Sequence, residues 1–326
     1  MVNRDSLAIA AVVVLAVVAL VLSTKRRAKP EMYVLVKGAE GFGDRMQCLL
    51  QAVRYAKRTA RALVVDWRDD HWCHDGRAGF EEFFTLIGVR SASIADLAYA
   101  LDDAPTVFPA RWTASAAVEP TRVADLYAHD AFSEPEQCTA KCVVHPGVKY
   151  RAWRCADASH VRARPWLAAR VARVFEGLSG PYTAVHLRGG DRLARRVAET
   201  GISHAEYVAS LRARVGQSET VVLVSDDAGL VAEYTRQCVA AGAPVPRVSG
   251  LTPPAECVAR ADAGTHLARP GDLPCPWLTK RELNANAVCD FVVLSHAARV
   301  VADGESLFSQ MARCVAYPAF GIRTRK

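Results

Sequence analysis

The side chains best suited to chemistry follow a short apolar run in the second half of the chain. Residues 182–185 read as a buried strand. The side chains that come directly after it are polar: His186, Arg188, Asp191 and Arg192. Ligands of an open α/β sheet bind beyond the carboxyl ends of its strands, and the Arg188 guanidinium offers a planar fork to two phosphate oxygens. We therefore expect an anion site here; the alternative is a surface loop with an ion pair to Asp191.

A glycine-rich turn in the first half is a second candidate anion site. The strand predicted at 32–36 leads into the turn 38–43, where glycine permits close backbone approach. A helix follows, with apolar residues at helical spacing over 46–56 and Asp44 as its predicted N-cap. A helix N-terminus that points at such a turn is a ready anion site, although a tight turn packed on the sheet is the alternative reading. The candidate ligand-binding residues are Gly41, Gly43, Asp44 and Arg45.

Carboxylates further along the chain suit a nucleotide. Asp290 lies on a helix predicted at 286–297, and its carboxylate can accept hydrogen bonds from N1–H and the exocyclic amine of guanine, which uracil lacks. A charge on the helix surface is the alternative for Asp290. The strand 221–224 is followed by the pair Asp226 and Asp227, which suits either hydrogen bonding or a metal ion near phosphates. Ser309 and Gln310 open the last predicted helix.

Parallel strands are needed to bring these groups to one edge. We expect further strands at 62–66, 244–248 and 299–302, and helices that begin near 203 and 230. Two βα-repeating halves predict an α/β fold of the GT-B-like kind, with two Rossmann-like domains facing across a cleft. The predicted divisions are residues 1–30, 31–178 and 179–326.

Two stretches are less regular. Residues 67–166 contain several prolines, and we expect loops and short helices there, some of them in contact with an acceptor. Residues 249–276 are rich in proline and glycine and predict a long loop, a common place for a lid.

The overall charge excludes one class of function. The net charge is +7, but part of the excess lies at 25–27 and 323–326, and no basic run is interleaved with aromatic residues. We therefore expect no nucleic-acid partner.

The ten cysteines leave two interpretations open. Cys138, Cys142 and Cys155 suit disulfides in an oxidising lumen, or they are free buried thiols. Neither the Cys138–Cys142–His145–Cys155 group nor the His71–Cys73–His74 group has the spacing of a familiar zinc module. We expect no bound metal.

The N-terminal region contains an apolar run. Residues 7–22, between Ser6 and Ser23, are long enough to span a bilayer. A cleavable signal peptide is the alternative, but Asp5 offsets Arg4 in its n-region and the run is long for an h-region. We expect a single-pass membrane anchor at residues 6–23.

In their order along the chain, these motifs resemble those of the GDP-fucose-dependent fucosyltransferase superfamily. The likeness is strongest to the α1,6-fucosyltransferases, which include the animal core enzyme and the bacterial nodulation-factor enzyme. It covers most of residues 32–318, and 67–166 and 250–280 have no counterpart.

The resemblance implies a glycosyltransferase that uses no metal or other cofactor, which the apolar run at 6–23 would anchor in a membrane. It would transfer fucose with inversion from GDP-fucose, bound by residues 179–326, to a glycan or glycoprotein hydroxyl on the side of residues 31–178. Arg188 would grip the β-phosphate, Asp290 would read guanine, and Glu199 would match the proposed base. Other matches are Asp191 as a catalytic residue, and His186, Ser309, Gln310, Asp226 and Asp227 at the donor.

The chain departs from the family at two places. Gly189 stands where the family often has a second arginine, and the predicted loop 191–204 is longer than in the closest relatives. The alternatives are a transferase of similar fold with another nucleotide sugar, and a catalytically inactive glycan-binding membrane protein.

The side of the membrane is open to two arguments. Lys25, Arg26, Arg27 and Lys29 follow the apolar run, which favours a cytosolic body. The animal relatives are lumenal, and a lumenal body also suits the cysteines. We favour the lumenal, Golgi-type placement.

Overall fold

The computed structural model describes most of the chain after residue 31. The described residues are 32–73, 79–120, 122, 126, 135, 137–146, 155–176, 178, 180–216, 219–249, 279–304, 306–315 and 320. Within them, no helix is both long and apolar enough to cross a membrane. The predicted anchor at 6–23 and most of the predicted loop 249–276 lie outside the described residues.

The first half forms a parallel sheet in the order β2–β1–β5–β4. The central strand β1 (Tyr33–Lys37) is buried throughout and pairs with β2 (Ala62–Asp66) and β5 (Cys142–Pro146). The short β4 (Val107–Phe108) pairs with the outer side of β5. Because both faces of β1 are covered, its apolar run is continuous instead of alternating. The helix α2 (Phe42–Thr59) connects β1 to β2, as the sequence predicts.

The second half repeats the architecture in the order β10–β7–β8–β9. The central strands are β7 (Thr183–Leu187) and β8 (Val221–Ser225), with β9 (Arg247–Val248) and β10 (Arg299–Ala302) at the edges, all parallel. The helices of this half are α8 (Gly190–Thr200), α9 (His204–Arg212), α10 (Ala228–Ala240), α11 (Lys280–His296) and α12 (Leu307–Cys314).

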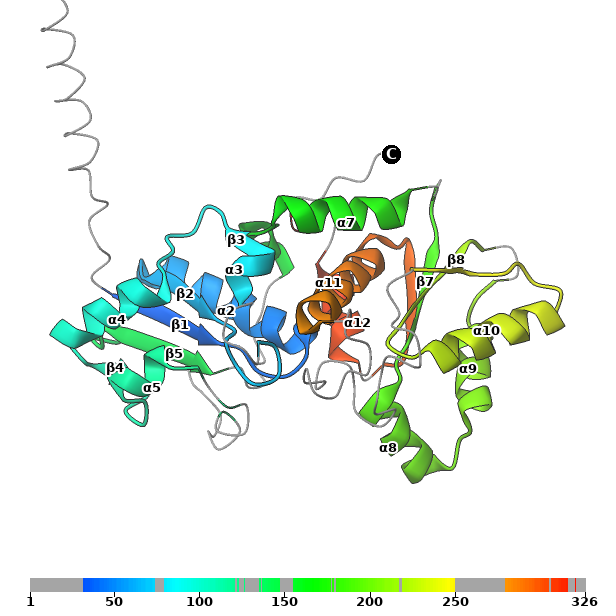
Figure 1. Cartoon of the computed structure of the whole chain (residues 1–326), viewed down its shortest axis with the longest axis horizontal. Coiled ribbons are helices and arrows are strands. Elements are labelled where there is room, and N and C mark those ends of the chain that lie inside the picture. Colours follow the sequence, from blue (N-terminus) through cyan, green and yellow to red (C-terminus); the bar gives the residue numbers. More distant parts are fainter. Residues whose placement is uncertain are drawn as a thin grey trace, which may run out of the picture.

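Shorter elements cover the first sheet and connect it to the second. They are α3 (Phe80–Phe83), β3 (Phe84–Leu86), α4 (Ile94–Asp103), α5 (Ala114–Val118), the 3₁₀ helix η1 (Cys155–His160), β6 (Val161–Ala163) and α7 (Pro165–Phe175). β3 and β6 form an antiparallel pair. α7 runs along one side of the molecule from the first half toward the second (Figure 1) and packs against α11.

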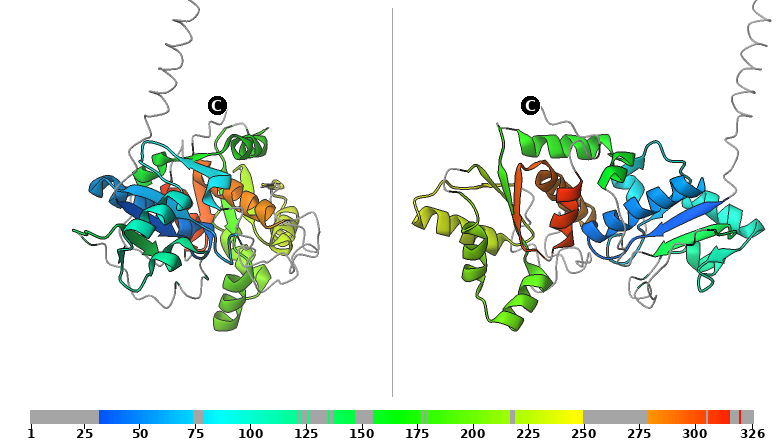
Figure 2. Two further views of the ribbon diagram at one scale, coloured as in Figure 1. Left: turned by 60° about the vertical axis from the view of Figure 1, so that its left-hand side comes forward. Right: turned by 180° about the vertical axis from the view of Figure 1, so that it is seen from behind.

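Aromatic rings and one glycine join the two halves. The Phe42 ring of α2 lies 5.0 Å from that of Phe291 and 6.5 Å from that of Phe308, measured between centroids. A Cβ at Gly43 would come within 2.8 Å of the Phe308 backbone nitrogen, so the start of α2 needs glycine there. α2 and α12 therefore pack against each other at the junction of the two sheets, as the right-hand view of Figure 2 shows.

Four local expectations need correction. The stretch 67–166, expected to be loops and short helices, contributes β5, a strand of the first sheet. The predicted loop 191–204 is mostly the helix α8. α11 begins at Lys280, earlier than the predicted 286. Asp44 is not an N-cap, because α2 begins at Phe42 and places Asp44 inside its first turn.

The cysteines also differ from the pairs considered. Cys155 of η1 forms a disulfide with Cys314 of α12, across a sequence separation of 159 residues. Cys138 and Cys142 are free. The described residues contain no cluster of His, Cys, Asp and Glu that could hold a metal.

Candidate active site

A cavity of about 150 Å³ lies where the two halves meet. It is bounded by the carboxyl ends of β7 and β8, the N-terminal turns of α2, α8 and α12, and one face of α11. The lining residues used below are Glu40, Gly41, Gly43, Asp44, His186, Arg188, Asp191, Arg192, Asp226, Asn286, Asp290, Ser306, Leu307 and Phe308.

Three helix N-termini reach this cavity without a side-chain cap. The N-cap residues of α2, α8 and α12 are Gly41, Gly189 and Ser306, and none accepts a hydrogen bond through its side chain from its own helix. By contrast, α4, α5, α9, α10 and α11 each have a side-chain cap. Free amides and the positive end of the helix dipole favour an anion. The three uncapped turns therefore suit a phosphate group.

Arg188 is positioned by carboxylates. It forms an ion pair with Asp226, and a longer one of 3.4 Å with Asp191. Asp226 also accepts a 2.8 Å hydrogen bond from the Gly189 backbone N–H. The guanidinium is thus fixed at the end of β7, where it can turn its remaining N–H groups to a ligand.

The predicted acidic pair divides into two roles. Asp226 holds Arg188, whereas Asp227 caps α10 by accepting from the backbone N–H groups of Gly229 and Leu230. A Cβ at Gly189 would lie 2.6 Å from Cβ of Asp227. Any larger side chain at position 189 would therefore meet Asp227.

His186 contributes hydrogen bonding instead of charge. Its Nδ1 lies 2.5 Å from Oγ of Ser309, and both side chains are buried. Burial lowers the pKa of His186 to about 4, so the imidazole is neutral at physiological pH. The described lining residues that carry positive charge are then Arg188 and Arg192.

Asp290 is buried and lines the cavity, and one of its carboxylate oxygens has no hydrogen-bond partner in the part of the chain that the structure describes. Only 8% of the residue is exposed, and its Oδ1 has no hydrogen bond within the described residues. Burial, with a smaller effect of the Asp226 charge, raises the Asp290 pKa to about 8. An unsatisfied buried carboxyl is costly unless a ligand supplies donors. Asp290 is therefore suited to bind a group that donates hydrogen bonds.

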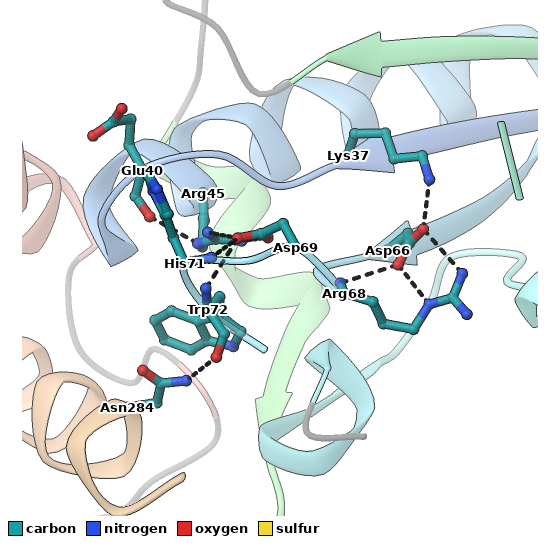
Figure 3. Close-up of polar contacts among 9 residues, drawn as sticks. All are labelled: Lys37, Glu40, Arg45, Asp66, Arg68, Asp69, His71, Trp72 and Asn284. Atoms are coloured by element: carbon teal, nitrogen blue, oxygen red, sulfur yellow. Dashed lines mark hydrogen bonds and ion pairs between the residues drawn. The ribbon is translucent and has the colours of Figure 1, made fainter. Parts of the chain in front are cut away.

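Some predicted site residues lie outside the cavity lining. Arg45 is fully buried and forms two hydrogen bonds with Asp69, as Figure 3 shows. Gln310 is exposed and donates to the Gly304 carbonyl. Glu199 is exposed in the last turn of α8, at the end opposite the cavity.

The lining residues that were not predicted from the sequence include Asn286 and Glu40. Asn286 lies one helical turn before Asp290, a spacing that was a usable signal. Glu40 lies within the predicted glycine turn, with a φ of 58° that is unusual for a residue other than glycine. Its carboxylate points away from the Arg45–Asp69 pair in Figure 3. Burial, and then the charge of Asp44, raise the pKa of Glu40.

Comparison with solved structures identifies the fold as that of fucosyltransferases. The fucosyltransferase NodZ from Bradyrhizobium superposes with a TM-score of 0.58 at 21% identity, over 88% of this chain and 92% of that one. The NodZ alpha-1,6-fucosyltransferase co-crystallized with GDP gives 0.56 at 21% identity, over 88% and 93%. POFUT1 in complex with GDP gives 0.51 at 12% identity, over 88% and 94%.

One curated protein is also similar in sequence. Nodulation protein Z of Sinorhizobium fredii (strain NBRC 101917 / NGR234) is 28% identical over 211 residues, which cover 58% of this chain and 62% of the relative. The match therefore spans less than two thirds of that relative. No family model matches the chain. The comparisons confirm the resemblance to GDP-fucose-dependent fucosyltransferases and the GT-B-like α/β fold.

Proposed function

We propose that this protein is a fucosyltransferase that moves fucose from GDP-fucose to a hydroxyl of a glycan or glycoprotein. One observation carries the proposal: a single cavity combines Arg188 and three uncapped helix N-termini with the buried carboxyl of Asp290, whose Oδ1 has no hydrogen bond among the described residues. Arg188 and the helix N-termini suit a diphosphate, and the Asp290 carboxyl suits guanine. Two similar solved structures support the assignment, one co-crystallized with GDP and one soaked with GDP-fucose.

The chemistry follows from the charge that develops on the leaving group. The acceptor oxygen attacks the anomeric carbon from the face opposite GDP, the bond from that carbon to the β-phosphate oxygen breaks, and the configuration inverts. Negative charge grows on the departing GDP, so Arg188 and the amides of α2 and α12 stabilise the transition state more than the bound donor.

A carboxylate of the cavity acts as the general base that removes the proton from the acceptor hydroxyl. Among Glu40, Asp44 and Asp191, we favour Glu40 because Asp191 already pairs with Arg188 and Asp44 lies within the first turn of α2. A raised pKa makes the Glu40 carboxylate a stronger base than an ordinary glutamate.

We propose that the reaction needs no metal. Asp226 forms an ion pair with Arg188 and accepts a hydrogen bond from the Gly189 N–H, and Asp227 accepts hydrogen bonds from the start of α10. Both carboxylates therefore already have partners within the protein. Transfer should continue in excess EDTA. Loss of activity with chelator and its return with Mn²⁺ would assign the pair to a metal.

We further propose a single-pass anchor at residues 6–23 and a lumenal, Golgi-type body. The Cys155–Cys314 disulfide supports the lumenal side, since disulfides persist in oxidising compartments. The positive charges at 25–29 argue for the cytosolic side. A C-terminal tag should resist protease in sealed microsomes and be digested once detergent is added. Digestion without detergent would place the body in the cytosol.

The proposed activity is tested with a donor panel. Purified full-length protein should transfer sugar from GDP-fucose onto a glycan array, and it should bind GDP more tightly than UDP in calorimetry. Transfer from a different nucleotide sugar would indicate a similar-fold transferase. Glycan binding without transfer from any donor would indicate an inactive lectin-like protein.

A further inference from the structure

The side of α11 that lines the cavity carries an amide beside Asp290. Asn286 precedes Asp290 by four residues, so both side chains lie on the same face of the helix, and both line the cavity. Asn286 is only half-buried, which leaves its amide accessible to a ligand.

Arg170 of α7 fixes the orientation of this amide. Its Nη2 donates to Oδ1 of Asn286 at 2.5 Å, while its Nη1 donates to Oε2 of Glu282 at 2.6 Å. A guanidinium has no acceptor, so only the oxygen of the amide can face it. The Asn286 NH₂ group must then point away from Arg170, and it donates no hydrogen bond in the part of the chain that the structure describes.

The cavity therefore presents a donor next to an acceptor. The Watson–Crick edge of guanine carries the complementary pattern, since O6 accepts while N1–H and the 2-amino group donate. Uracil places a second carbonyl where guanine has its amine, opposite an Asp290 oxygen. Adenine carries an amine where guanine has O6, opposite the Asn286 donor.

We propose that Asn286 donates a hydrogen bond to O6 of guanine and so determines base specificity together with Asp290. Arg170 is a positioning residue that acts through Asn286. This inference rests on the proposed use of a GDP-linked donor and adds a second base-reading residue to it.

The test is a thermodynamic cycle between one side chain and one ligand atom. Calorimetry on the full-length protein would compare GDP with 6-thioguanosine diphosphate, in which a poor sulfur acceptor replaces O6 while both donors remain. Asn286→Ala should lower the affinity for GDP by roughly tenfold, the loss expected for one hydrogen bond. It should change the affinity for the thio analogue far less, so that the wild-type preference for GDP disappears.

A matched pair of variants tests the role of Arg170. Arg170→Met frees the amide to rotate and should lower the GDP preference over the thio analogue. Glu282→Gln removes the ion pair but leaves the bond from Arg170 to Asn286, so it should keep that preference.

The outcomes separate this inference from the proposed function. If the wild-type protein binds GDP no better than UDP, the proposed donor is wrong. In the other case, the wild-type protein prefers GDP while Asn286→Ala lowers the affinities for GDP and the thio analogue equally, with an unchanged melting temperature. Asn286 then does not bind O6, and the inference is overturned.

Discussion

Arg188 supplies a charge that is held in place before any ligand binds. Arg188→Lys keeps the charge but removes the planar fork, so it should lose most activity while the protein stays folded. Arg188→Ala should cost about 2–5 kcal/mol of transition-state stabilisation, with turnover affected as well as donor binding. Steady-state kinetics and melting temperatures measure both effects.

Arg192, in the first turn of α8 just after Arg188, provides the comparison. It is exposed, whereas Arg188 is fixed by Asp226, so Arg192→Ala should be the milder variant. Near-normal turnover in Arg188→Lys would refute the phosphate-binding role.

Asp290 should couple GDP binding to pH. In the free protein its pKa is about 8, and only the ionised carboxylate can accept from both guanine donors. Binding therefore releases a proton, and GDP affinity should fall by up to about tenfold per pH unit as the pH drops below that value. Asp290→Asn should bind GDP more weakly and lack this pH dependence. A wild-type affinity that is flat between about pH 6.5 and pH 8 would contradict the assignment.

Glu40 and Glu199 offer a direct comparison of two candidate bases. Glu40→Gln should lower turnover by about 10²–10⁴-fold with donor affinity largely kept, because the lost group acts on the acceptor proton. The wild-type acidic limb should lie above the usual range of a glutamate, since the Glu40 pKa is raised. Glu199→Gln, exposed at the far end of α8, should keep most of the turnover. A large loss of turnover in Glu199→Gln and little loss in Glu40→Gln would identify Glu199 as the general base.

At the level of elements, the meeting of α2 and α12 holds two uncapped N-termini at one cavity. Gly43→Ala would place Cβ 2.8 Å from the backbone nitrogen of Phe308, and neither backbone can move without separating the helices. We expect a loss of about 1–3 kcal/mol in the free energy of unfolding, together with weaker GDP binding. Denaturant unfolding and calorimetry measure the two effects.

Gly304→Ala serves as the control for that substitution. A Cβ at Gly304 would have no atom within 4 Å, and the backbone there is not left-handed, so stability should hardly change. Equal stability of the two variants would show that the close approach at Gly43 is unimportant.

At the scale of the whole molecule, the Cys155–Cys314 disulfide closes a loop between η1 in the first half and α12 in the second. Cys155→Ser, Cys314→Ser and the double variant should each lose about the same stability, roughly 2–4 kcal/mol, because each removes the same cross-link. Reductant should lower the melting temperature of the wild-type protein but not of the variants. Additive losses in the double variant would contradict the bond.

The sequence by itself determined β1, β2 and the strands of the second sheet, the βα order and several helix starts, but not the strands within 67–166. Ala62–Asp66 and Arg299–Ala302 lie where their apolar runs predict them, and Ser203 caps α9 as expected. These features depend on neighbours within one helical turn or one strand, so local pattern is sufficient to find them.

Only the tertiary structure decided which polar groups share the cavity. Arg45 and Arg188 each lie shortly after a buried strand and close to glycines, yet Asp69 neutralises the first inside the core and the second faces the cavity. Asp226 and Asp227 are adjacent, but one bonds Arg188 and the other caps a helix. The partner of Cys155 lies 159 residues away, and that of Asn286 lies 116 residues away on α7. Such pairings depend on how separate elements pack, which residue type and local spacing do not encode.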